Sequence, residues 1–239
     1  MTAEDKTRLA ALLDTAGDFL RDGHWRDREA PAFEDDAAAA RGIAYAGDTP
    51  EAIAGDIRSC SACGLCEVRI LAVPGEGVRQ PRVLVIGEAP GSEEDEKGRP
   101  FVGPAGRLLD RMLAGIALSR STNCFITNTV KCRPPGNRVP LPAETAACVP
   151  FLIRQIRTVR PAFILCMGRV AAQTMLRTDE GIGRLRGTFF EYTMDAASGA
   201  AAASIPLIAT YHPSALLRDA SLKRPAWEDL KKLFTRLQT

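Results

Sequence analysis

A polar loop near the middle of the chain holds the residues best suited to chemistry. The stretch GEAPGSEEDEKGRPFVGPAG, from Gly87 to Gly106, combines five carboxylates with Phe101, which its neighbours Pro100 and Gly103 predict to be exposed. Carboxylates can act on a water molecule, and an aromatic face can stack on a planar ligand. The carboxylates are Glu88, Glu93, Glu94, Asp95 and Glu96.

The position of this loop is where α/β proteins bind ligands. Residues 82–86, Arg-Val-Leu-Val-Ile, read as a buried strand before the loop, and residues 107–117 read as a helix after it. In open α/β sheets, ligands bind outside the carboxyl ends of the strands. Taken alone, the loop is still explained by a solvated charge run at 93–97 and a core phenylalanine. Three further features favour a functional site.

The first feature is a set of cysteines with metal-ligand spacing. Cys60 and Cys63 are separated by two residues, which lets both sulfurs reach one centre. Cys132 and Cys148 form a second pair. Four thiolates suit zinc and an iron–sulfur cluster alike. The spacing therefore predicts a metal site without naming the metal.

The other cysteines of the seven have different explanations. Cys124 and Cys166 lie in predicted strands, where a free cysteine usually serves as a small buried hydrophobe. Cys66 is ambiguous, because it continues a ferredoxin-like run that Ile70 fails to complete. A disulfide framework is not expected, because the cytoplasm keeps thiols reduced.

The second feature is Asn128, at the carboxyl end of the predicted strand 124–127. Its amide presents a donor and an acceptor side by side, which matches the edge of a pyrimidine, although an ordinary turn would also accept an asparagine. The loop continues as RPPGNR from Arg133 to Arg138, which is rigid, basic and suited to touching phosphates.

The third feature is the segment YHPS, Tyr211 to Ser214, after the last predicted strand. His212 is one of two histidines in the chain, and it stands where the loops of a parallel sheet converge. A histidine there is also often a structural, hydrogen-bonded residue. The following ALLR, residues 215–218, is either a tip that inserts into a base stack or the core face of a short helix.

The elements that position these residues alternate between strand and helix. This alternation predicts an α/β fold with a mostly parallel central sheet and helices on both faces. A helix opened by Thr49 and Pro50 delivers the first cysteines at its end. The remaining predicted strands are 163–167, 188–192 and 205–210, and the remaining predicted helices are 142–159 with an interruption at Pro150, 168–176 and 225–237.

Charge and composition divide the chain. We expect residues 1–48 to be a mobile, acidic, Ala-rich extension with an amphipathic helix over Thr2 to Leu20, and residues 49–239 to form one domain. Residues 1–60 carry thirteen acids against seven Lys and Arg, whereas residues 99–160 carry ten Lys and Arg against two acids. The basic part fits a polyanion partner or a solubilising face. With no signal peptide and no membrane-spanning run, we expect a cytoplasmic monomer that does not bind membranes.

Several of these motifs occur together in one known family. GEAPG with GRPFVGPAG, ITNTVKCRPPGNR, a cysteine pair on either side of that core, and YHPS closely resemble the family 4 uracil-DNA glycosylases, the iron–sulfur branch of the uracil-DNA glycosylase superfamily. The resemblance covers about residues 57 to 237, and each motif follows a predicted strand in the same order.

The resemblance implies a three-layer α/β/α domain that flips uracil out of single- or double-stranded DNA and hydrolyses its glycosidic bond. This leaves an abasic site for base excision repair, without strand cleavage. The implied cofactor is a 4Fe-4S cluster, whose ligands would be Cys60, Cys63, Cys132 and Cys148.

The resemblance also implies roles for the residues of the site. Phe101 would stack on the flipped uracil, Asn128 would read its N3 and O4 edge, and His212 would donate to O2. Glu88, Glu94 and Asn137 would position water or belong to the polar network around it. Substrate contacts are also expected from Gly87 and Ala89, and DNA contacts from Arg133, Arg138, Ser214, Arg218 and from Leu216 or Leu217, which would fill the gap in the duplex.

One departure leaves the general base unassigned. The superfamily's best-known branch has an Asp two residues after the glycine of the first motif, and Ala89 stands there in this chain. That fits family 4, but it makes Glu88 a hypothesis. Two alternatives remain open: a same-fold glycosylase for hypoxanthine or xanthine, which Asn128 disfavours, and a non-catalytic iron–sulfur DNA-binding protein.

Overall fold

The computed structural model describes residues 48–193 and 204–238. The chain divides into two compact units, residues 1–35 and 36–239, and every described residue belongs to the second. The predicted N-terminal extension and its helix lie outside the described residues, apart from Asp48. Within the described ranges, none of the helices combines the length and the apolar character needed to cross a bilayer.

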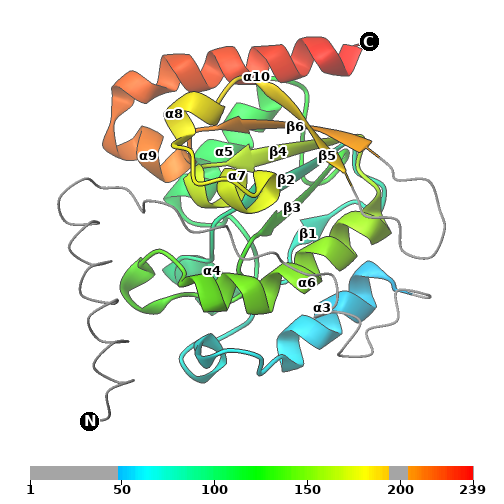
Figure 1. Cartoon of the computed structure of the whole chain (residues 1–239), viewed down its shortest axis with the longest axis vertical. Helices are drawn as coiled ribbons and strands as arrows, with labels where there is room; N and C mark the ends of the chain where they lie inside the picture. The colour runs from blue at the N-terminus through cyan, green and yellow to red at the C-terminus, as the bar shows by residue number, and fades with distance from the viewer. Residues whose placement is uncertain (1–47, 194–203, 239) are drawn as a thin grey trace, which may run out of the picture. The chain divides into compact units, whose positions relative to one another are not determined.

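A six-stranded sheet forms the centre of the second unit, in the order β1-β3-β2-β4-β6-β5 (Figure 1). The four inner strands run parallel, and the edge strands β1 and β5 pair antiparallel with their neighbours. The predicted mostly parallel sheet is therefore confirmed. The strands are β1 (Glu76–Gly77), β2 (Val83–Gly87), β3 (Cys124–Asn128), β4 (Phe163–Met167), β5 (Phe189–Thr193) and β6 (Ser204–Thr210).

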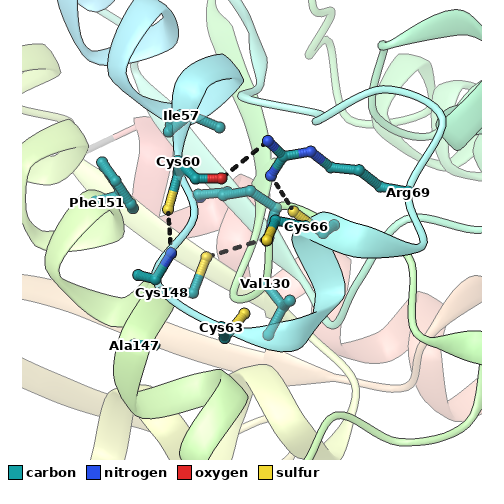
Figure 2. A pocket seen from close by; sticks show the side chains of 12 residues that line it. Ile57, Cys60, Cys63, Cys66, Arg69, Val130, Ala147, Cys148 and Phe151 are labelled. Carbon is teal, nitrogen blue, oxygen red and sulfur yellow. Dashed lines mark hydrogen bonds between the residues drawn. The ribbon is translucent and has the colours of Figure 1, made fainter.

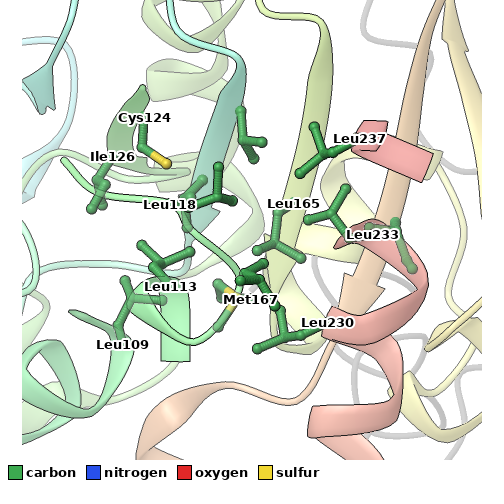
Figure 3. Packing of buried hydrophobic residues seen from close by; sticks show 14 of the residues in the cluster. Leu109, Leu113, Leu118, Cys124, Ile126, Leu165, Met167, Leu230, Leu233 and Leu237 are labelled. Carbon is green, nitrogen blue, oxygen red and sulfur yellow. The ribbon is translucent and has the colours of Figure 1, made fainter. Parts of the chain in front are cut away.

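Helices cover both faces of this sheet, as predicted. Because side chains alternate along a strand, Val83 and Val85 face one layer, whereas Leu84 and Ile86 face the other. The first layer consists of α5 and α10, whose leucines pack on Leu165 of β4 (Figure 3). The second contains α6, α7 and α8. Such burial is worth about 1.5–3 kcal/mol for each large apolar side chain, and it holds the three layers together.

The helices agree with the predicted ones in most places. Thr49 caps the first described helix by accepting a hydrogen bond from the Ala52 N–H at 3.1 Å. The α-helices are α3 (Pro50–Ser59), α4 (Ser92–Lys97), α5 (Pro104–Ala114), α6 (Pro142–Val159), α7 (Arg169–Leu176), α8 (Ile182–Leu185), α9 (Pro213–Arg218) and α10 (Lys223–Gln238), and the 3₁₀ turns are η1 (Gly64–Glu67), η2 (Pro135–Asn137) and η4 (Ala220–Leu222).

The predicted interruption at Pro150 was wrong, because α6 runs through it without a break. A proline inside a helix lacks one backbone donor and costs about 3 kcal/mol. The turns after Pro150 bury Leu152, Ile156 and Val159 in the core. Burial of these three side chains outweighs the local cost.

The predicted loop from Gly87 to Gly106 was also wrong in part, because Ser92–Lys97 within it form the helix α4. Its first turn is closed by Glu94, whose Oε2 accepts the Gly91 N–H at 3.1 Å. Its end is set by Gly98, which adopts a left-handed φ of 65°. The run is only partly solvated, because Glu94 and Asp95 are buried.

Candidate functional site

The carboxyl ends of the parallel strands bring the predicted site residues together. Gly87 ends β2 and lies opposite Asn128, which ends β3. Gly168 follows β4, and a Cβ built on it would lie 2.8 Å from the His212 Cβ, just after β6. Residues far apart in the sequence therefore meet at one edge of the sheet.

Gly87 is the point on which two of these side chains converge. A Cβ built on Gly87 would lie 2.4 Å from the Asn128 Oδ1 and 2.4 Å from the Phe101 Cζ. Any larger residue would displace the amide or the ring. A planar ligand lying between them would thus contact the Gly87 backbone.

Asn128 presents an unused acceptor at this point. Its side chain is 1% exposed, and no donor among the described residues reaches its Oδ1. An unsatisfied buried polar atom costs about 1–3 kcal/mol, so it marks a place where a ligand donor would bind.

Phe101 is buried, and the prediction that it is exposed was wrong. It is 5% exposed and belongs to the core cluster on the α5 and α10 side. Its φ of 53° is left-handed, a conformation that costs a residue with a side chain about 1–3 kcal/mol. The centre of its ring lies 5.6 Å from that of His212, at 36° between the planes.

His212 caps α9, and its hydrogen bonds define which ring nitrogen carries the proton. Nδ1 accepts the backbone N–H of Ser214 at 3.2 Å and lies 2.8 Å from the Ser214 Oγ. Because a backbone N–H only donates, the neutral ring holds its proton on Nε2. Burial and, to a smaller extent, the charge of Arg218 lower the pKa of His212 to about 4. At neutral pH, the ring is an uncharged donor through Nε2.

Glu88 and Ala89 follow Gly87 and are half-buried. Burial raises the pKa of the Glu88 carboxyl, and the charges of Arg169 and Arg218 oppose this shift. Ala89 packs on the apolar cluster around the cysteines. A carboxyl of raised pKa beside Gly87 is a stronger base than an exposed one.

Glu94 is bound to the backbone of its own loop. Its Oε1 accepts the N–H groups of Val102 and Gly103, both at 2.8 Å, and its Oε2 accepts that of Gly91. These bonds place Glu94 under the loop that carries Phe101. The geometry shows a carboxylate holding backbone rather than one exposed to water.

The residues expected to touch DNA differ in exposure. Leu216 is 2% exposed, whereas Leu217 is 49% exposed, so of the two leucines only Leu217 presents its side chain at the surface. Arg218 and its neighbour Ser214 lie on the same short helix α9. The predicted core face of a short helix is therefore confirmed at Leu216, and the same helix also exposes an apolar side chain at Leu217.

The RPPGNR loop forms its own set of contacts. Arg133 Nε donates to the Asn137 Oδ1 at 2.8 Å, and the guanidinium of Arg138 binds both oxygens of Glu144 at 2.7 and 2.8 Å. Asn137 is exposed. Among the described contacts, none joins Asn137 to Asn128 or His212, so the structure does not bring it into the same cluster.

Five cysteines line one pocket (Figure 2). Three come from the end of α3 and the turn η1 after it, one comes from the loop after β3, and one comes from α6, which packs beside α3. Apolar side chains, such as Ile57 and Phe151, line much of the remaining wall, together with Arg69 and Lys131. The five are Cys60, Cys63, Cys66, Cys132 and Cys148. Cys124 and Cys166 are instead buried in the sheet, as predicted.

Donors surround the sulfurs of this pocket. Arg69 donates to the Cys132 Sγ at 3.0 Å, and the backbone N–H of Lys131 points to the Cys148 Sγ at 3.3 Å. Burial raises the pKa of Cys148 to about 12, so an added cation is needed to hold it as thiolate. Within residues 48–193 and 204–238, no three His, Cys, Asp or Glu side chains are arranged for a single metal ion. Five thiols, of which Cys132 and Cys148 accept these N–H···S hydrogen bonds, are a donor set that suits a metal centre.

Three residues with clear structural roles escaped prediction from the sequence. Lys131 is 1% exposed, and its ammonium binds the Asn128 carbonyl at 2.6 Å. Arg69 reaches the cysteine pocket, and Arg120 binds the Phe101 carbonyl at 2.9 Å. Lys131 stands between Asn128 and Cys132 in the sequence, which is a signal that could have been used. Arg120 carries no such signal.

Comparisons with known proteins agree with this geometry. The Uracil DNA glycosylase superfamily matches over residues 74–231. The Type-4 uracil-DNA glycosylase of Pyrobaculum aerophilum is 41% identical over 182 residues, which cover 74% of this chain and 89% of that protein. That of Thermotoga maritima is 40% identical over 185 residues, covering 76% and 91%. A Type-5 uracil-DNA glycosylase of Mycobacterium tuberculosis is 33% identical over 158 residues, covering 59% and 57%. The chain therefore belongs to the uracil DNA glycosylase superfamily, and within it to the type-4 uracil-DNA glycosylases.

Proposed function

We propose that this protein is a monofunctional glycosylase that removes uracil from DNA and leaves an abasic site. The observation that carries the proposal is the buried Oδ1 of Asn128, which has no partner among the described residues and converges with the Phe101 ring on Gly87. The centre of that ring lies 5.6 Å from the centre of the His212 imidazole. The names of the type-4 relatives support the same activity.

Asn128 accounts for the choice of base. Uracil carries a hydrogen on N3 and an acceptor at O4, which match the Oδ1 and the NH₂ of the amide. Cytosine has an acceptor at N3 and an amino group at C4. Its N3 would therefore face the acceptor Oδ1, and its amino group would face the donor NH₂ of the amide. Burial makes such a mismatch costly, by about 1–3 kcal/mol for each unsatisfied group.

His212 accounts for the stabilisation of the leaving group. When the bond between C1′ and N1 breaks, its electron pair leaves on uracil, and charge develops on O2. A neutral imidazole with its proton on Nε2 donates to that oxygen, and the Ser214 N–H holds the ring in this tautomer. One donor of this kind is worth about 3–4 kcal/mol in comparable sites.

Glu88 is our proposed partner of the attacking water. The water oxygen bonds to C1′, and one of its protons passes to the Glu88 carboxylate, whose raised pKa suits it as a base. Glu94 and Asn137 were expected to share this role. The backbone contacts of Glu94 support a role in holding the loop, and Asn137 is engaged by Arg133 at the surface.

The target nucleotide must leave the base stack first, at a cost of a few kcal/mol. We assign Leu217 to the gap left in the duplex, since its side chain is exposed. Arg133, Arg138, Ser214 and Arg218 are the proposed phosphate contacts. The same proposal includes single- or double-stranded DNA as the partner, a monomeric protein and a location in the cytoplasm.

Cys60, Cys63, Cys132 and Cys148 would hold a 4Fe-4S cluster in the cysteine pocket, and Cys66 would line it. When bound, the cluster would supply cross-links between α3, the loop after β3 and α6. The N–H donors from Arg69 and Lys131 support this assignment, because they offset the negative charge of thiolates.

A single-turnover assay tests the proposal. Uracil-containing oligonucleotides, single-stranded and paired with G, are incubated with the protein, and alkali is then added to cut abasic sites. We expect strand breaks only after alkali. Breaks without alkali would contradict the monofunctional reaction, and release from hypoxanthine or xanthine but not uracil would contradict the assigned substrate.

A further inference from the structure

We propose that Arg120 is a positioning residue for Phe101. It holds the backbone of Phe101 in the left-handed conformation from which the ring faces Asn128 and His212. This inference rests on the proposed function for its meaning, because Phe101 matters to catalysis only as the ring that stacks on the flipped base.

The backbone at Phe101 needs an external restraint. Its φ of 53° is unfavourable for a residue with a side chain, and such a conformation persists only where the surroundings enforce it. The Phe101 carbonyl also lies in a position open only to glycine on α5, since a Cβ built on Gly106 would lie 1.9 Å from that oxygen.

Arg120 supplies this restraint through two carbonyl groups. Its Nη1 donates to the Pro100 carbonyl and its Nη2 to the Phe101 carbonyl, each at 2.9 Å. These carbonyls belong to successive peptide units on either side of the Phe101 Cα. Fixing both defines the direction in which the side chain leaves the backbone.

The guanidinium is itself held by two carboxylates. Its Nε and Nη2 bind Asp110 of α5 at 3.0 and 2.7 Å, and its Nη1 binds Glu76 of β1. All five N–H donors of an arginine are thereby used, and the side chain is 16% exposed. A lysine has three donors without the planar fork, so it cannot reproduce this set.

Glu94 completes the restraint from the other direction. It accepts the N–H groups of Val102 and Gly103, which follow Phe101 directly. The guanidinium of Arg120 therefore binds the two carbonyl groups around the Phe101 Cα, and the carboxylate of Glu94 binds the next two N–H groups of the backbone. Of these two residues, Glu94 was among the site residues expected from the sequence, whereas Arg120 was not.

The test is a double-mutant cycle between Arg120 and Phe101, measured as single-turnover uracil release. We expect Arg120→Met to slow release by at least tenfold in the wild-type background, and by less than threefold in a Phe101→Ala background, because the ring that it positions is gone. Equal slowing in both backgrounds would overturn the proposal. Arg120→Lys serves the same cycle where the methionine variant does not fold.

Arg99→Met is the matched control. Arg99 also binds Glu76, at 2.7 and 3.1 Å, and no described contact joins it to the Phe101 backbone. We expect near-normal release from it. If Arg99→Met and Arg120→Met slow release equally, the effect comes from the shared carboxylate, and the proposal fails.

A second readout separates this inference from the proposed function. In protein labelled with 4-fluorophenylalanine, the ¹⁹F resonance of Phe101 is assigned by its absence in Phe101→Leu. We expect one sharp line in the wild type and in Arg99→Met, and a shifted or broadened line in the Arg120 variants. An unchanged line would overturn the positioning role, whereas a wild type that releases no uracil would overturn only the proposed function.

Discussion

Gly87 and Asn128 are partners in the parallel pairing of β2 and β3, and a Cβ on the glycine would lie 2.4 Å from the amide oxygen of the asparagine. The position of the Asn128 amide, which we propose reads the base, therefore follows from the register of the sheet. Its geometry depends on backbone hydrogen bonds, such as that from the Thr129 N–H to the Gly87 carbonyl at 2.8 Å. A rigid sheet holds the amide in place before any base arrives.

We predict that Gly87→Ala lowers uracil release by at least about a hundredfold, because the added methyl group displaces the Asn128 amide or the Phe101 ring by contact. Single-turnover rates and a thermal unfolding curve measure it. Gly183→Ala is the control, since nothing lies within 4 Å of a Cβ built there. Normal release by the Gly87 variant would remove Gly87 from the substrate site.

We predict that Asn128→Ala lowers uracil release about 10–100-fold, the range expected when a buried hydrogen-bonded group loses its partner. DNA affinity, measured by fluorescence anisotropy on an oligonucleotide without uracil, should change little, because the amide reads the base and not the backbone. Loss of affinity for undamaged DNA would show that Asn128 supports the fold instead.

We predict that His212→Ala lowers release about 100–1,000-fold with DNA affinity retained, since it removes the donor at O2. His212→Gln, which keeps an N–H donor, should recover part of the loss. A normal rate in the alanine variant would show that leaving-group stabilisation comes from elsewhere.

The proton of His212 can be located directly. Its lowered pKa of about 4 predicts a neutral ring, protonated on Nε2, from pH 5 to pH 8. Two-dimensional ¹⁵N–¹H NMR of the imidazole distinguishes this tautomer from the imidazolium. A charged ring at pH 6 would contradict the neutral-donor mechanism.

The same group contributes to the pH dependence of stability. Between about pH 4 and its ordinary pKa of 6.5, the unfolded chain binds a proton at His212 that the folded chain does not. The free energy of unfolding should therefore fall as pH decreases through this window. Denaturant titrations at several pH values should show a shallower fall for His212→Asn, and an identical fall would contradict the assigned pKa shift.

We predict that Cys132→Ala loses the proposed 4Fe-4S cluster and lowers the unfolding temperature, because bound metal contributes folding energy. Iron and sulfide content and visible absorbance measure the loss. Cys66→Ser is the matched control, as it lines the same pocket without belonging to the proposed ligand set. If the purified protein contained zinc and no iron, the 4Fe-4S assignment would be wrong. If the Cys66 variant lost its iron, Cys66 would belong to the ligands.

The sequence alone predicted the strands β2 to β6, a mostly parallel sheet and most of the helices, because an apolar run or a helical cap is a local pattern. The order of the strands in the sheet was not predicted. It also placed Asn128 and His212 at strand ends, where loops of a parallel sheet must meet. The short edge strand Glu76–Gly77 escaped prediction, since two residues hold no pattern and form a strand only by pairing with β3.

Only the tertiary structure decided how Phe101 is used and what holds it. Phe101 is buried, has a left-handed backbone and accepts a hydrogen bond from Arg120. These features depend on contacts between segments that are far apart in the sequence, so no local pattern predicts them. The continuity of α6 through Pro150 has the same origin, because the energy of packing against the sheet exceeds the local cost of the proline. Local patterns define the elements, whereas the conformation of individual residues follows from long-range packing that competes with local preference.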